Sequence, residues 1–217
     1  MGDLSYEVFE VPPFDLSDVF SVDAAFANAP EFEFKCAQQL GEGVIFCKGK
    51  ILLGWVGDCL AVDAHLEDSR VWTAARHRND PLFALGDTLE LFAGVHGEKK
   101  YIEYHYAPNG LTLQLLWPEN ARKLGIRDVS ELVKYHIVED ATEYAVHLTE
   151  DGWRVCVLLP AGALGLDVVN LRGSLWDISF GRYDYPIGGG EPVLSSTSTF
   201  SRLDFHFREE WSVLRFV

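Results

Sequence analysis

Carboxylate and imidazole side chains alternate with apolar residues in several short segments of this 217-residue chain. Successive side chains of a β-strand point to opposite faces of its sheet, so each segment would place its acids and histidines on one face. If these segments were neighbouring strands, a single sheet face would carry several acids and imidazoles. The residues concerned are Asp63 and His65, Glu103 and His105, Glu90, and His147.

Such an acidic, histidine-bearing face is open to three interpretations. It could be a solvated or internally hydrogen-bonded outer face. It could be a sugar cleft, in which carboxylates accept hydrogen bonds from hydroxyl groups while an aromatic ring stacks on the C–H face of the sugar. It could also hold a divalent metal or hydrolyse a bond, because paired acids with histidine serve as ligands or as acid and base; no HExxH-like spacing supports this third interpretation.

Residues 79–92 bring one of these acids next to an aromatic loop. The loop carries Phe83, the pair Gly86-Asp87 begins a strand, and Glu90 projects from that strand. Trp72 lies in the preceding loop, where it could stack on a sugar or cover an apolar edge of the sheet. The tryptophans expected to pack in the interior are Trp117, Trp153 and Trp211.

The segments that position these residues are mostly predicted to be short strands. Turn signals at Pro108-Asn109-Gly110 and Glu150-Asp151-Gly152 join neighbouring segments. Residues 119–125 are the best candidate for a short helix, with Gly125 at its end. The pattern predicts one all-β domain over residues 1–217, an antiparallel β-sandwich of the immunoglobulin-like or jelly-roll type with one or two short helices. The expected strands cover residues 31–36, 51–56, 60–66, 87–94, 100–107, 111–117, 132–138, 142–149, 153–159, 168–180 and 211–216, and residues 187–192 and 195–201 are expected to be loops.

Composition excludes several classes of partner. The formal net charge of -15 argues against nucleic acid and against anionic membrane surfaces, because both require a basic surface. No apolar stretch approaches the roughly 18 residues of a bilayer-spanning helix. The first residues carry no leader pattern, which predicts a cytoplasmic protein unless a leader precedes this chain. The oligomeric state stays open.

Signatures of enzymes and of zinc sites are absent from the sequence. No GxSxG elbow, P-loop or dinucleotide-binding glycine pattern occurs, which favours a non-catalytic protein and leaves an enzyme open. The four cysteines lack CxxC spacing, so zinc is not expected. Cys156 lies in an apolar run and is predicted to be a buried thiol. A disulfide among Cys36, Cys47 and Cys59 is left open.

The order and spacing of motifs over roughly residues 50–217 resembles that of family 9 carbohydrate-binding modules and their relatives in the DOMON superfamily. The motifs that carry this resemblance are Glu67-Asp68, Gly86–Phe92, Tyr101–Tyr104, Pro108–Gly110, Asp151-Gly152-Trp153 with Leu159-Pro160, Asp177–Arg182, Phe205-His206 and Glu210–Leu214.

The resemblance implies a β-sandwich that binds carbohydrate between two aromatic rings without catalysis. Glu90 matches the acid of the family, and Phe83 stands where sugar-binding members have Trp. Glu103 stands near a basic position of the family and so carries the opposite charge. The second Trp of the family has no counterpart that the sequence identifies. The resemblance, the loop position of Trp72 and the strand position of His105 together give the expected ligand-binding residues, which are Glu90, Phe83, Trp72, Glu103, Arg182, Asp177 and His105.

The resemblance also bears on cofactors and leaves two other functions open. Haem-binding relatives commonly use Met and His as axial ligands, and the only Met here is Met1, so no haem is expected. Calcium sometimes stabilises such sandwiches, and a structural calcium would bind in an acidic loop such as Glu67-Asp68 or Glu139-Asp140. The alternatives to sugar binding are a divergent sandwich that serves as a protein-interaction domain and a small glycoside hydrolase.

Overall fold

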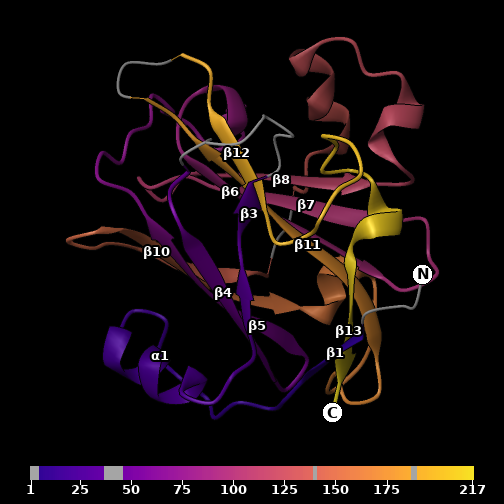
Figure 1. The fold of residues 1–217 in the computed structure, drawn as a ribbon. Helices are drawn as coiled ribbons and strands as arrows, with labels where there is room; N and C mark the ends of the chain where they lie inside the picture. The colour runs from indigo at the N-terminus through magenta and orange to yellow at the C-terminus, as the bar shows by residue number, and fades with distance from the viewer. Residues whose placement is uncertain (1–4, 37–45, 139–140, 187–189) are drawn as a thin grey trace.

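Two β-sheets pack face to face and enclose the largest core cluster of the protein (Figure 1). This computed structural model describes residues 5–36, 46–138, 141–186 and 190–217. Within them, the larger sheet (sheet A) has eight strands, in the order β1-β13-β11-β6-β7-β8 with β12 paired to β11 and β3 paired to β12. The smaller sheet (sheet B) has five, in the order β2-β4-β5-β10-β9. Every pairing is antiparallel except that of β1 with β13.

The elements have the following bounds. The strands of sheet A are β1 (Ser5–Val8), β3 (Lys35–Cys36), β6 (Thr88–Val95), β7 (Tyr101–Tyr106), β8 (Thr112–Trp117), β11 (Leu175–Asp184), β12 (Val193–Ser196) and β13 (Ser212–Phe216). Those of sheet B are β2 (Glu31–Glu33), β4 (Gly49–Val56), β5 (Cys59–Glu67), β9 (Glu143–Leu148) and β10 (Gly152–Pro160). The helices are α1 (Val19–Phe26) and the 3-10 helices η1 (Leu82–Ala84), η2 (Ala121–Leu124), η3 (Val129–Tyr135), η4 (Ala161–Leu164) and η5 (Arg208–Glu210).

Alternation along the strands decides which side chains fill the space between the sheets. Leu89 and Leu91 of β6 and Leu60 and Val62 of β5 are fully buried in one cluster. Because the side-chain period of a strand is two, Glu90 must point away from this core. The antiparallel β-sandwich expected from the sequence is therefore confirmed.

The outer face of sheet A is covered by connecting segments rather than by solvent. Residues 73–85, 118–137 and 197–211 contribute side chains to a second apolar cluster on this face. Phe92 and Trp117 of the sheet belong to it and are almost fully buried. The polar side chains of the outer face are consequently enclosed, which excludes the solvated outer face considered above.

Helix α1 covers the outer face of sheet B, and the sequence did not predict it. Asp18 caps the helix, because its side chain accepts a hydrogen bond from the Phe20 N–H. Val22 and Phe26 then pack with Cys156 in a third buried cluster. The helix has only eight residues, which is too short for apolar periodicity to reveal it.

Two strand predictions are wrong. The segment 31–36 is two strands rather than one, since the chain crosses from sheet B to sheet A at the buried Phe34. Residues 132–138 do not form a strand, because η3 occupies most of the segment. Asp128 caps η3 by accepting from the Ser130 N–H, and His136 alone makes an isolated bridge to β8.

Other boundaries shift while the element type holds. The strand expected at 168–180 is β11, which begins and ends later. The segment expected to be a loop at 195–201 begins inside β12. The helix expected at 119–125 is the 3-10 helix η2, and it ends at Gly125, whose φ of 65° suits glycine.

The cysteine side chains that the structure describes are free thiols. Cys156 is buried as expected, and Cys47 and Cys59 are free thiols. The side chain of Cys36 lies outside the described part of the structure. Among the helices described, none combines the length and apolar character needed to cross a bilayer.

Candidate functional site

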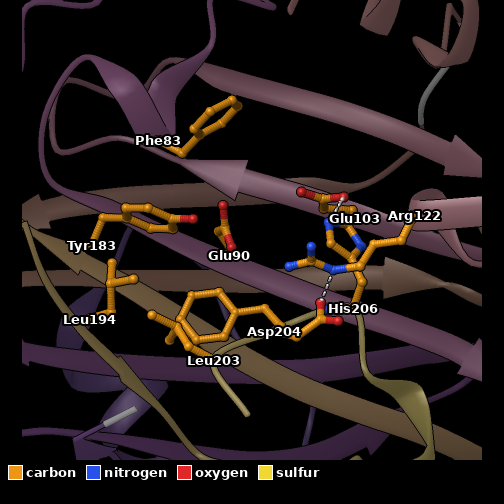
Figure 2. A pocket seen from close by; sticks show the side chains of 10 residues that line it. Phe83, Glu90, Glu103, Arg122, Tyr183, Leu194, Leu203, Asp204 and His206 are labelled. Carbon is orange, nitrogen blue, oxygen red and sulfur yellow. Dashed lines mark hydrogen bonds and ion pairs between the residues drawn. The ribbon is translucent and has the colours of Figure 1, made fainter. Parts of the chain in front are cut away.

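A hollow of about 230 Å³ opens on the outer face of sheet A, over β6, β7 and β11. Figure 2 shows Glu90 in the middle of this hollow, with Tyr183 on one side and Arg122 and His206 on the other. The lining residues are Phe83, Glu90, Glu103, Arg122, Tyr183, Leu194, Leu203, Asp204, Phe205 and His206.

The strand register brings together three polar side chains, Glu90, Glu103 and His105, which form the floor of the hollow. Glu90 on β6 lies directly opposite His105 on β7. Glu103 is two residues before His105 on the same strand, so both side chains share the outer face. All three are enclosed, with Glu90 3%, Glu103 5% and His105 0% exposed.

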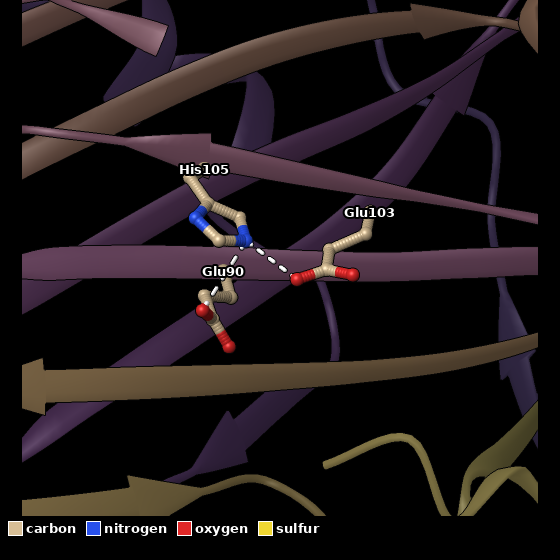
Figure 3. A group of neighbouring side chains, drawn as sticks. All are labelled: Glu90, Glu103 and His105. Atoms are coloured by element: carbon tan, nitrogen blue, oxygen red, sulfur yellow. Dashed lines mark hydrogen bonds and ion pairs between the residues drawn. The ribbon is translucent and has the colours of Figure 1, made fainter. Parts of the chain in front are cut away.

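One imidazole nitrogen lies between the two carboxylates (Figure 3). His105 Nε2 is 2.7 Å from Glu103 Oε1 and 3.2 Å from Glu90 Oε1. The other oxygen of Glu103 accepts a 2.6 Å hydrogen bond from Trp117 Nε1–H and lies 3.7 Å from His206 Nε2. Glu103 is therefore well satisfied, whereas the contact found for Glu90 among the described residues is the longer one to His105.

These contacts separate the pKa values of the two acids. Burial raises the pKa of Glu90 to about 8, and the charge of Glu103 adds to the rise although His105 opposes it. Burial would also raise the pKa of Glu103, but His206, His105 and the Trp117 N–H lower it below its ordinary value. The pKa of His105 is raised because the two acids outweigh its burial. At neutral pH the floor thus holds an ionised Glu103 beside a protonated Glu90.

Three aromatic rings form the walls of the hollow. Phe83 comes from η1, Tyr183 from β11 and Phe205 from the loop before η5. The ring centroids of Phe83 and Tyr183 are 6.2 Å apart, and those of Tyr183 and Phe205 are 5.9 Å apart. Gly181 makes room for Phe205, because a Cβ there would lie 2.8 Å from its ring and 3.2 Å from Glu90 Oε2.

Two exposed arginines at the rim of the hollow contact the buried Asp204. Arg122 Nε lies 2.6 Å from Asp204 Oδ1, and Arg202 Nη2 lies 3.4 Å from the other oxygen. Both arginine side chains are 60% exposed. A second hollow of about 280 Å³ adjoins the first and shares four lining residues with it, Arg122 among them. A ligand longer than one ring could extend past Arg122 into that space.

Four of the residues expected from the sequence meet at this site. Glu90, Phe83 and Glu103 line the hollow. His105 lies beneath them in contact with both acids. The structure does not bring Arg182, Asp177 or Trp72 to the hollow.

Arg182 is buried on the inward side of β11, opposite to the face of Tyr183. Its guanidinium donates to the carbonyl oxygens of Lys48, at 2.9 Å, and Glu67, at 2.6 Å. These bonds connect β11 to the end of β5 and to the residue before β4. Gly181 is the residue of β11 opposite Glu90, and Arg182 follows it, so Arg182 points to the other face of the sheet. The sequence did not reveal the register of β11 that this conclusion requires.

Asp177 and Trp72 occupy other regions. Asp177 faces the outer side of sheet A, but it contacts His96 at 2.6 Å and Arg208 at 2.8 Å and lines a separate hollow. The Trp72 N–H donates to Asp87, and the Trp72 ring lies 6.2 Å from that of Tyr185. Trp72 thus packs beside the start of β6, outside the hollow.

The single acid and histidine face expected from the sequence is also wrong. Asp63 and His65 lie on β5, and His147 lies on β9, both in sheet B. Strand alternation cannot tell which sheet a strand joins, because pairing is decided by contacts distant in the sequence.

Several lining residues were missed as site residues. Phe205 and His206 were part of the family resemblance without a role, and Arg122 and Asp204 carried no signal. All four lie outside the strands, on segments that reach the sheet only through tertiary packing. No local pattern could have placed them beside Glu90.

Among the residues that the structure describes, two groups of acidic or histidine side chains come close enough to hold a cation. Besides the floor of the hollow, oxygens of Asp68, Asp87 and Asp184 lie within 4.8 Å of one another. Arg182 Nη2 lies 3.8 Å from Asp68 and 3.9 Å from Asp184, so one guanidinium offsets only part of the charge of the three acids, and the group fits the structural calcium considered above. Glu139-Asp140, the other acidic loop considered, lies outside the described residues.

Comparison with known proteins detects similarity of structure but not of sequence. The chain matches no protein-family model, and no curated protein is detectably similar in sequence. A protein from Bacteroides uniformis to which carbohydrate binding has been assigned superposes with a TM-score of 0.75 at 14% identity, over 100% of both chains.

A family 9 carbohydrate-binding module from Caldicellulosiruptor kristjanssonii, solved with cellotriose, gives a TM-score of 0.66 at 12% identity, over 98% of this chain and 93% of that chain. A family 9 module from the same organism, solved with glucose, gives 0.64 at 12% identity, over 98% of this chain and 95% of that chain. At these identities the similarity establishes a shared β-sandwich fold.

Proposed function

We propose that the protein binds carbohydrate, without catalysis, in the hollow over Glu90 and Glu103. The observation that carries this proposal is a pair of enclosed acids at the floor of a small cavity walled by aromatic rings. Ligand sites combine apolar and aromatic walls with a few convergent polar groups, and a cavity of about 230 Å³ admits one sugar ring. The modules with cellotriose and glucose share this fold, which favours a sugar over other small ligands.

The floor and the walls recognise different parts of a sugar. The ionised Glu103 accepts hydrogen bonds from hydroxyl groups, while the protonated Glu90 can donate one. Phe83, Tyr183 and Phe205 offer ring surfaces to the C–H groups of the sugar. Each such stack or charged hydrogen bond contributes on the order of 1–2 kcal/mol, so a one-ring ligand would bind with millimolar to micromolar affinity.

A glycoside hydrolase is a weaker alternative. A retaining enzyme places the scissile bond between its two carboxyl groups. Here one oxygen of each acid contacts His105 from beneath the hollow, so a substrate would compete with the imidazole for both acids.

A protein-interaction domain is also weaker. Such a surface would be expected to present a broad apolar patch, whereas this site is a concave hollow with three carboxylates in its lining. The exposed rim of the hollow is charged rather than apolar.

Calorimetric titration tests the proposal directly. Mono- and oligosaccharides, including glucose and cellotriose, are titrated into the protein and into Phe83→Ala, which removes a wall. We expect saturable binding that weakens about fivefold to tenfold in the variant. Phe20→Ala is the matched control, because Phe20 is 84% exposed on α1. Absence of binding by every sugar, or equal weakening in both variants, would contradict the proposal.

A further inference from the structure

The three acids that line the hollow differ in how many cations and hydrogen-bond donors they contact. Arg122 and Arg202 both contact Asp204, so the rim acid is paired. Glu103 receives His105, His206 and the Trp117 N–H. Glu90 shares His105 with Glu103 and has the longer contact of the two.

One oxygen of Glu90 is left available to a ligand. Oε1 faces His105 at 3.2 Å, and within the described residues no hydrogen-bond donor is found for Oε2. The neighbour across β11 is Gly181, which offers no side chain. Tyr183, the other titratable group on β11 near Glu90, is neutral because burial raises its pKa. Oε2 therefore points into the hollow beside Gly181 without a cationic partner.

Without a ligand, the Glu90 carboxyl carries a proton instead of pairing with a cation. Burial raises the pKa of Glu90 to about 8, so the acid is neutral under most conditions. A positively charged group from a ligand would stabilise the carboxylate instead. Such a group would also lie among the rings of Phe83, Tyr183 and Phe205, whose faces attract cations.

We propose that the sugar bound in this hollow carries a free amine, whose ammonium group pairs with the Glu90 carboxylate. The inference rests on the proposed function and names its ligand class as an amino sugar. On binding, the O–H bond of the Glu90 carboxyl breaks and its proton passes to solvent, while the ammonium keeps its protons. No other bond changes, so charge and protons balance.

Proton release gives the proposal a pH signature. Below about pH 8, affinity for an ammonium-bearing sugar rises with pH, by up to about tenfold per unit while the amine stays charged. A neutral sugar needs no ionised Glu90, so its affinity does not rise over the same interval. Each amine bound near pH 6 releases up to about one proton.

Three sugars that differ at one position test the inference by calorimetry. Glucosamine is compared with N-acetylglucosamine, which lacks the charge, and with glucose, near pH 6 in two buffers of different ionisation enthalpy. We expect glucosamine to bind about tenfold tighter than either neutral sugar, with proton release. The readout is the ratio of the glucosamine and glucose affinities, which Glu90→Gln should bring to about one. Glu150→Gln, at an exposed turn, removes the same charge elsewhere and should keep the preference.

The outcomes separate this inference from the proposed function. Equal binding of the three sugars, or a preference that survives in Glu90→Gln, overturns the amine and leaves carbohydrate binding standing. Loss of the preference in Glu150→Gln also overturns it, because overall charge would then be the cause. No binding by any sugar, with the fold verified by circular dichroism, overturns both proposals.

Discussion

The same pair of residues, an acid followed two positions later by a histidine, occurs on the outer face of each sheet. In sheet B it is Asp63 and His65 on β5, with His65 Nε2 2.9 Å from Asp63 Oδ2. In sheet A it is Glu103 and His105 on β7, with the corresponding distance 2.7 Å. The two pairs look alike in the sequence, yet their surroundings give them different chemistry.

In sheet B an arginine completes the pair. Arg154 donates to both oxygens of Asp63, at 2.6 Å and 2.8 Å, and also contacts Asp23 of α1 at 2.8 Å. Burial alone would raise the pKa of Asp63, but His65 and Arg154 lower it. The acid is fully ionised and fully bonded beneath a helix, so nothing remains to bind a ligand.

In sheet A the third member is another acid instead of a cation. Glu90 occupies the place beside His105, its pKa rises, and a hollow opens above it. An acid and histidine pair is thus structural where a cation closes it, and available for recognition where a second carboxylate and a cavity face it. The difference lies in the partners, and variants of those partners test it.

The largest effect is expected from Arg154→Met. Removing the guanidinium leaves the buried Asp63 carboxylate without its main partner, which costs about 3–5 kcal/mol of unfolding free energy. Urea unfolding followed by tryptophan fluorescence measures the loss. Arg122→Met is the comparison on the rim of sheet A, where the guanidinium is 60% exposed and Arg202 still contacts the buried Asp204, so the loss should be smaller, about 1 kcal/mol. Equal losses in the two variants would remove the distinction between a closed and an open pair.

Stability should depend on pH through Glu90 and not through Asp63. The pKa of Glu90 rises from 4.5 to about 8 on folding, so the native state binds more protons than the unfolded state between these values. The free energy of unfolding therefore falls as pH increases across this window, by an amount on the order of a few kcal/mol. The pKa of Asp63 is lowered, so its contribution is lost only in acid, below about pH 4.

Glu90→Gln removes this dependence with little change of shape, together with the rise that the charge of Glu90 gives to the pKa of His105. The variant should lose less stability than the wild type between about pH 5 and 8 in denaturant titrations. Asp87, whose pKa is raised to about 7, contributes the same slope to both proteins and cancels in the comparison. Parallel curves for the two proteins would show that Glu90 is ionised throughout.

Gly181→Ala should disturb the hollow alone. The added Cβ would lie 2.8 Å from the Phe205 ring, so the ring must move, at a cost of about 1–3 kcal/mol. Sugar affinity should fall with it, because Phe205 is a wall of the site. In Gly162→Ala the new Cβ meets no atom within 4 Å, which makes it the control. Full affinity in Gly181→Ala, measured by calorimetry, would exclude Phe205 from the binding surface.

The smallest effect is expected from His65→Gln. Its side chain is 35% exposed, and Arg154 already satisfies Asp63, so the loss should stay below about 1 kcal/mol. His105→Gln replaces a fully buried ring between two acids and should cost clearly more. Comparison of the two melting temperatures checks this order. A reversed order would mean that His65 contributes more to stability than His105 does.

The sequence by itself determined the β-sandwich and the pairing of side chains within each strand. Alternation is local, so Glu103 and His105 had to share a face, and Glu90 had to oppose the core residues Leu89 and Leu91. Turn signals such as Pro108-Asn109-Gly110 located the hairpin between β7 and β8. Short-range geometry suffices for such statements, because it depends only on neighbouring residues.

Only the tertiary structure decided which of these residues meet. It separated Asp63 and His65 from Glu90 by placing β5 in the other sheet. It also brought Phe205 and Arg122 to Glu90 from segments distant in the chain. Strand partners and loop positions result from the packing of the whole chain, which no local pattern records. For that reason two pairs alike in sequence became a closed ion cluster in one sheet and the floor of a hollow in the other.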